Sequence, residues 1–89
     1  MSMQFANAAA HAGALDVRQI YRDGVLVATL MTVDQGGTFA VVAEVFGPEG
    51  NEGGAKRRPY IFPDADSAQS FLAEAVTAFT YLGCEIRQL

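Results

Sequence analysis

The first half of the chain consists mainly of short apolar segments separated by turn residues. Asp23-Gly24 lies between the first two segments, and an Asp-Gly pair in this setting is typical of a type I′ hairpin turn. Residues 34–37, with two adjacent glycines, indicate a second turn. The pattern therefore predicts an antiparallel meander of three strands. The predicted strands are residues 16–22, 25–33 and 38–46.

A glycine-rich segment separates this meander from a fourth strand and a helix. Residues 47–55 hold four glycines, one proline and two glutamates, so we expect an exposed and mobile loop there. The fourth strand is expected at residues 56–62, where Pro59 favours an edge position because it lacks an N–H. Apolar residues then recur at i, i+3, i+4 and i+7 spacing, which predicts a helix over residues 64–82.

Both ends of the helix are marked in the sequence. Asp64 or Asp66 can cap its first turn, and Gly83 is placed to end it. Residues 84–89 either add a short terminal strand or continue as a tail. The predicted fold is therefore an α+β domain in which a four-stranded antiparallel meander is followed by one C-terminal helix.

The Ala-rich N-terminus, residues 1–15, is expected to be a flexible tail in front of a single domain over residues 16–89. It contains the A-x-A pattern of signal-peptidase sites, but its start carries no positive charge and polar residues interrupt the apolar run. No segment approaches the ~18 apolar residues that a membrane helix requires. We therefore expect a cytoplasmic protein without a membrane partner.

Side-chain alternation along the strands predicts which residues share a face of the sheet. The expected pairs are Arg22 with Val25 and Val33 with Thr38. They place an almost wholly apolar set beneath the helix, namely Val17, Gln19, Tyr21, Leu26, Ala28, Leu30, Phe39, Val41, Ala43 and Val45. The opposite face then holds Arg18, Ile20, Arg22, Val25, Val27, Thr29, Met31, Ala40, Val42, Glu44 and Phe46.

This opposite face is half aliphatic, whereas a sheet face that contacts only water is mostly polar. One helix covers one face, so the other face needs a partner. A homodimer is the simplest solution, because a self-complementary patch closes under two-fold symmetry. A ligand, a nucleic acid, a cover made by residues 1–15, or a solvent-exposed face are the alternatives. The residues expected in the dimer interface are Ile20, Val27, Met31, Val42 and Phe46.

Composition argues for a folded protein and against an enzyme. The 89 residues are 51% hydrophobic and 18% charged, which excludes a disordered chain. A single cysteine, Cys84, excludes an internal disulfide, and with one histidine, His11, it excludes a zinc site built from Cys and His alone. Neither side chain has a partner in the sequence that would activate it. We therefore expect no catalytic residues, no metal and no cofactor.

Basic and aromatic residues interleave on the first and fourth predicted strands. This pattern is typical of surfaces that bind single-stranded nucleic acid, where cations contact the backbone and bases stack on rings. It also fits aromatics that fill a core beside a charged strand edge that resists aggregation. A net charge of −4 argues against a dedicated duplex-DNA binder. The candidate nucleic-acid-binding residues are Arg18, Arg22, Lys56, Arg57, Arg58, Tyr60 and Phe62.

The order of these elements resembles a PUR repeat and, more widely, the Whirly-like single-stranded DNA-binding transcriptional regulators. The resemblance spans roughly residues 16–83 and is carried by the segments VAEVFGPEG, KRRPYIF and SAQSFLAEAV. It implies intimate pairing of two ββββα units and nucleic-acid binding on a sheet surface. We expect a small non-enzymatic, dimeric interaction or regulatory module, with a single-stranded DNA or RNA binder as the alternative.

Overall fold

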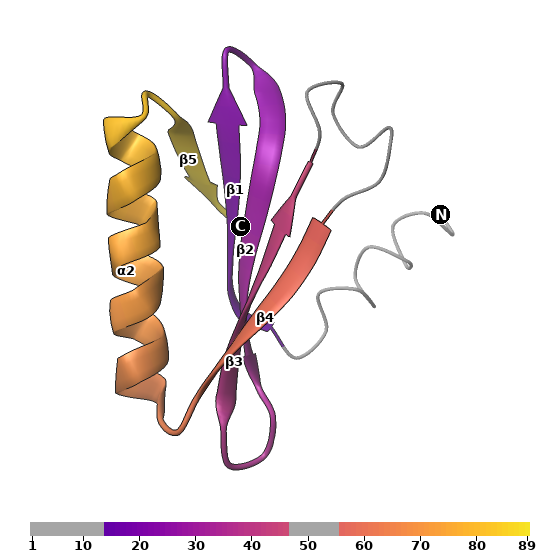
Figure 1. Ribbon diagram of the computed structural model, residues 1–89, viewed down its shortest axis with the longest axis vertical. Helices are drawn as coiled ribbons and strands as arrows, with labels where there is room; N and C mark the ends of the chain where they lie inside the picture. The colour runs from indigo at the N-terminus through magenta and orange to yellow at the C-terminus, as the bar shows by residue number, and fades with distance from the viewer. Residues whose placement is uncertain (1–13, 47–55) are drawn as a thin grey trace.

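The computed structural model describes residues 14–46 and 56–89, which form a five-stranded antiparallel sheet with one helix against it (Figure 1). The strands are β1 Ala14–Arg22, β2 Val25–Asp34, β3 Phe39–Val45, β4 Lys56–Phe62 and β5 Glu85–Gln88, and the helix is α2 Ala65–Tyr81. Their order across the sheet is β4-β3-β2-β1-β5. The predicted α+β class, the meander of four strands and the helix that follows it are confirmed.

The limits of the domain differ from the expectation in two places. A fifth strand, β5, pairs with β1 through Ile86 and Ile20, so the predicted four-stranded sheet is wrong by one strand. Of the two possibilities for residues 84–89, the structure adopts the terminal strand. β1 begins at Ala14, slightly before the expected start of the domain. The rest of the expected tail and the loop at residues 47–55 lie outside the described residues.

A β-bulge in the first hairpin reverses the faces on which β1 residues lie. Arg22 pairs with Val25 as predicted, but Ile20 pairs with Ala28, so Val27 is an extra residue on β2. Successive side chains of a strand point to opposite faces. One extra residue on β2 therefore moves the β1 side chains from Ile20 toward the start of the strand to the face opposite the predicted one. The predicted faces of β1 are therefore wrong. The turn itself is as expected, since both of its central residues have positive φ.

The second hairpin differs from the prediction without changing any face. Val33 pairs with Ala40 and not with Thr38. This shift is even, so the side chains of β3, and those of β2 from Ala28 onward, keep the faces that the alternation predicted.

The core lies between α2 and the sheet. Ile20 is fully buried and packs with Leu30 and Val41 from the sheet and with Ala68 and Leu72 from the helix. These helix residues belong to the apolar stripe that the sequence spacing predicted. One side of the sheet is therefore fixed against α2, and the other side faces away from it.

One buried polar group in this core is expected to reduce stability. Thr32 is 4% exposed, and its hydroxyl has no hydrogen-bond partner among the described residues. We expect Thr32→Val, which keeps the shape but removes the hydroxyl, to raise the free energy of unfolding by about 1 kcal/mol. Urea unfolding would show a higher midpoint with an unchanged slope. Thr29→Val on the other face is the control without this gain, and a lowered midpoint for Thr32→Val would contradict the prediction.

Helix α2 uses Asp64 as its N-cap. The backbone N–H of Ser67 donates to Oδ1 of Asp64 at 2.8 Å, and this hydrogen bond holds the pKa of Asp64 below its ordinary value of 3.8. Asp66, the other predicted cap, lies in the first turn. At the far end, Gly83 has a φ of 86° and follows the C-cap residue Leu82, as expected for a helix that ends on glycine.

The cap makes helix stability depend on pH in the acid range. Since the pKa of Asp64 is lower in the folded than in the unfolded chain, the charged cap stabilises above pH 3.8. This contribution is lost as the pH falls through the lower, folded-state pKa. Asp64→Asn keeps a capping side chain but cannot titrate, so it should flatten this part of an acid-unfolding curve followed by circular dichroism. Asp66→Asn is the matched control, and equal curves for the two variants would contradict the assignment.

Candidate interaction surfaces

The face of the sheet opposite α2, here called the open face, carries no helix within the described residues (Figure 1). Two rows of aliphatic side chains run across it, and the members of each row pair with one another between neighbouring strands. The first row is Val17, Met31, Val42 and Pro59, and the second is Val33, Ala40 and Ile61. Ile61 is 56% exposed and Met31 and Val42 are half-exposed, whereas Val17 and Ala40 are buried. An aliphatic band thus lies across the middle strands.

A polar row borders this band. Arg87, Gln19, Thr29, Glu44 and Arg57 pair across all five strands. The Arg87 guanidinium lies 4.2 Å from the centroid of the Tyr21 ring, and its Nε is 2.9 Å from a carboxylate oxygen of Glu85. The open face therefore combines an aliphatic band with a polar row along one side of it, and protein–protein interfaces also combine apolar and polar areas.

The residues predicted for a dimer interface divide between the two sides of the sheet. Met31 and Val42 lie on the open face. Ile20 does not, because it is fully buried beneath α2, and Val27 packs against the same core. Phe46 follows β3, is half-exposed, and donates its backbone N–H to the Val27 carbonyl at 3.0 Å. The bulge accounts for both misplaced residues.

The candidate nucleic-acid-binding cations do not share one surface. Arg57 belongs to the open-face row opposite Glu44, whereas Lys56 and Arg58 are on the α2 side of β4. Arg22 is exposed on β1 beside the first turn, three strands away from the cations of β4. Sequence order therefore brings three cations together on β4, but the fold distributes them over two faces.

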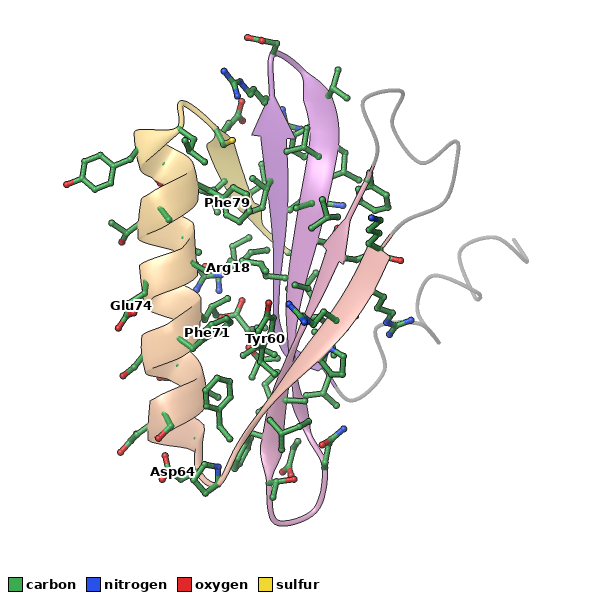
Figure 2. All side chains as sticks on the ribbon, viewed as in Figure 1. Arg18, Tyr60, Asp64, Phe71, Glu74 and Phe79 are labelled. Atoms are coloured by element: carbon green, nitrogen blue, oxygen red, sulfur yellow. The ribbon has the colours of Figure 1, made fainter. Side chains whose placement is uncertain are left out.

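The remaining candidates are engaged in contacts of their own. Arg18 is on the α2 side and forms two hydrogen bonds with Asp16, of 2.8 and 2.9 Å, which raise the pKa of the guanidinium above its ordinary value. The ring of Tyr60 lies 4.7 Å from that of Phe71 on α2, centroid to centroid (Figure 2). The ring of Phe62 lies 5.3 Å from the same Phe71 ring. These two aromatics therefore help to attach the helix to the sheet.

A groove opens at the corner of the α2 side that the helix does not cover. α2 begins beside the Phe62 end of β4 and runs toward β5, so the Lys56 end stays clear of the helix (Figure 1). The hollow there has a volume of about 410 Å³. We call it the basic groove, and it is lined by Ala43, Val45, Lys56, Arg57, Arg58 and Tyr60.

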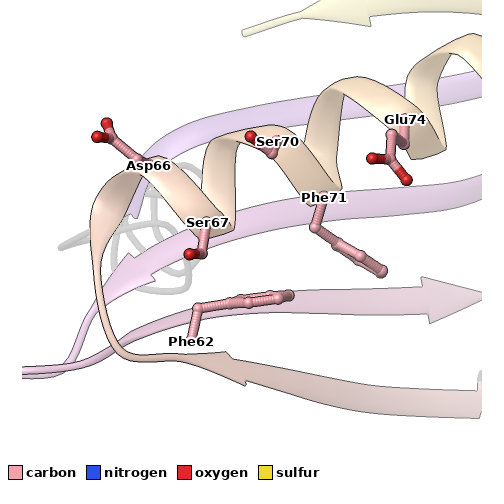
Figure 3. A pocket seen from close by; sticks show the side chains of 6 residues that line it. All are labelled: Phe62, Asp66, Ser67, Ser70, Phe71 and Glu74. Carbon is pink, nitrogen blue, oxygen red and sulfur yellow. The ribbon is translucent and has the colours of Figure 1, made fainter.

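A second hollow, of about 420 Å³, lies between α2 and β4. Its lining is Phe62, Asp66, Ser67, Ser70, Phe71 and Glu74 (Figure 3). In Figure 3, Phe71 extends from the helix toward the strand that carries Phe62. The Tyr60–Phe71 contact links the linings of the two hollows, one of which is basic and the other acidic.

Among the described residues, other reactive or metal-binding groups are few. Cys84 is half-buried and packs against the core, as expected of a structural cysteine. In residues 14–46 and 56–89, no three His, Cys, Asp or Glu side chains gather in a way that could hold a metal ion. Over the same residues, no helix has the length and apolar character needed to cross a membrane. His11 lies outside the described residues.

Comparison of the chain with protein-family models, curated proteins and solved structures gave no match. The open face and the basic groove are therefore the basis for proposing a function.

Proposed function

We propose that this chain is a small, non-enzymatic binding module that works as a homodimer, with the open faces of two copies packed against each other. The observation that supports this most strongly is the pair of aliphatic rows, centred on Met31 and Val42, on a face without a helix. Sheets that pack face to face bury such rows between them. Two copies would give a four-layer arrangement with a helix on each outer side.

The edges of the sheet favour this arrangement over edge-to-edge pairing. β4 begins with three cations, and Pro59 has no N–H to offer to a further strand. β5, at the other edge, is four residues long and carries the Glu85–Arg87 ion pair. Charges, proline and short edge strands are the features by which sheets avoid pairing at their edges. The open face is therefore the better surface for self-association.

The border of the open face is suited to a second copy. Glu44 and Arg57 lie toward one side of the polar row, and Glu85 and Arg87 toward the other. Because a two-fold interface brings the same patch of both copies together, each copy supplies carboxylates and guanidinium groups to its partner. Complementary charges at the rim contribute specificity more than affinity.

Analytical ultracentrifugation of the full chain tests this proposal. We expect sedimentation velocity at tens of micromolar to give the mass of a dimer, with dissociation on dilution. A monomer at that concentration would contradict the proposed function.

Single-stranded DNA or RNA is the alternative ligand that the sequence suggests, and the geometry supports it less. Its candidate cations are divided between two faces, and the rings of Tyr60 and Phe62 pack on Phe71. Titration with labelled oligonucleotides at two salt concentrations distinguishes this function, because phosphate contacts weaken steeply as salt rises.

A further inference from the structure

We propose that the basic groove is a docking site for an extended acidic peptide segment of another protein, one in which carboxylates alternate with apolar side chains. The groove combines an apolar floor with cations along its border, and these two features point to that ligand class together. The floor is formed by Ala43 and Val45 on β3, and the border by Lys56 and Arg58 on β4.

The charge of the groove contrasts with that of the chain. Lys56, Arg57 and Arg58 are half of the six basic residues in a chain whose net charge is −4. Among the described residues two ion pairs form, one within β1 and one within β5, and neither involves these three cations. All three side chains are exposed. A local concentration of cations on an acidic protein attracts an acidic partner and orients its approach.

The floor of the groove explains why the ligand needs apolar side chains. Val45 is 49% exposed and Ala43 is half-exposed, although both are on the same face as the buried core residue Val41. They are accessible because α2 does not extend over this end of β3. Successive side chains of an extended peptide point to opposite sides, so alternate apolar residues can contact this floor. The carboxylates between them are then within reach of the bordering cations.

The aromatic side chain in the groove is a poor platform for a nucleobase. The ring of Tyr60 is 4.7 Å from that of Phe71, and the Arg58 guanidinium is 5.9 Å from the Tyr60 centroid. The remaining floor is aliphatic, whereas single-stranded nucleic acid is held by stacking on aromatic rings. An acidic peptide therefore fits the lining better than DNA or RNA does.

The groove is complete within one chain and lies on the α2 side of the sheet. Arg57 borders both surfaces, but the floor of the groove and the cations Lys56 and Arg58 are on the α2 side. Binding there does not depend on dimer formation through the open face, so failure of one proposal leaves the other intact. The two surfaces also have different chemistry, since the open face has an aliphatic centre and the groove has a cationic border.

Fluorescence anisotropy with the full chain tests the site with three labelled probes. They are a peptide that alternates Glu with Leu and Phe, the same peptide with Gln in place of every Glu, and an oligothymidylate. We expect the Glu peptide to bind, the Gln peptide to bind about tenfold more weakly, and the affinity to fall with added salt. Arg58→Glu should weaken binding of the Glu peptide about tenfold. Arg22→Glu makes the same charge change at an exposed site outside the groove and should leave binding unchanged.

Methyl NMR of the unaltered chain gives a second measurement that requires no variant. Addition of the Glu peptide should shift the methyl resonances of Ala43 and Val45 and leave that of Met31 on the open face unchanged. Equal binding of the Glu and Gln peptides, equal affinity of the two Arg variants, or shifts at Met31 alone would overturn the proposal. If the oligothymidylate binds and the Glu peptide does not, the nucleic-acid function replaces this proposal. If none of the three probes binds, the proposal is also overturned.

Discussion

Ile20→Ala is expected to lower the free energy of unfolding by about 2–5 kcal/mol, the range found when a large buried aliphatic side chain is cut back. Ile20 is fully buried between α2 and the sheet, so its removal leaves a cavity in the centre of the core. Small domains are stable by only about 5–15 kcal/mol. Urea unfolding followed by circular dichroism should therefore show a large fall in the midpoint.

The neighbouring residue on β1 provides a matched control. Gln19 lies on the open face, and Gln19→Ala should change the free energy of unfolding by less than about 0.5 kcal/mol. If the hairpin had no bulge, Ile20 would point away from α2 and Gln19 toward it. A larger effect of Gln19→Ala than of Ile20→Ala would thus show that the register is wrong.

Val42→Asp is expected to dissociate the proposed homodimer. Val42 lies in the first aliphatic row between Met31 and Pro59, at the centre of the open face. A two-fold interface places the new carboxylate near its counterpart, and like charges in an interface cost several kcal/mol. We therefore expect the dissociation constant to rise by about 100-fold or more. Sedimentation should give a monomer at concentrations where the unaltered chain is dimeric.

The control carries the same substitution outside the two rows. Val25 is 46% exposed at the first turn, and Val25→Asp should leave the dimer intact. Circular dichroism should show the helix signal of both variants unchanged, since neither residue belongs to the core between α2 and the sheet. Dimers of equal affinity in both variants would exclude the open face as the interface.

Local patterns predicted most of the elements because each carries its own sequence signature. The Asp23-Gly24 turn, the apolar stripe of the helix and Gly83 act within a few residues of chain. The bulge at Val27 has no such signature. β2 is apolar at nearly every position from Val25 to Met31, so a shift of one residue replaces one apolar side chain by another on either face. The alternation of β2 therefore gave no information about which face of β1 meets the helix.

The basic groove was missed for a different reason. The sequence placed Ala43 and Val45 on the α2 side correctly, but it did not show how far the helix extends across the sheet. That reach depends on the path of the chain from Phe62 into α2 and on the twist of the sheet, which are properties of the whole domain. The cations of β4 were recognised as a run, yet their position beside Val45 follows only from the β3–β4 register.

The pairing of β5 with β1 joins the last described strand to the first. Before Glu85–Gln88 leave the ribosome, the outer edge of β1 has no partner strand, and Ile20 lacks its neighbour Ile86. Contacts between residues so far apart in the chain form slowly, because the intervening segment must first be ordered. The sheet is therefore completed only after synthesis of the whole domain, and the nascent chain carries an unpaired strand edge until then.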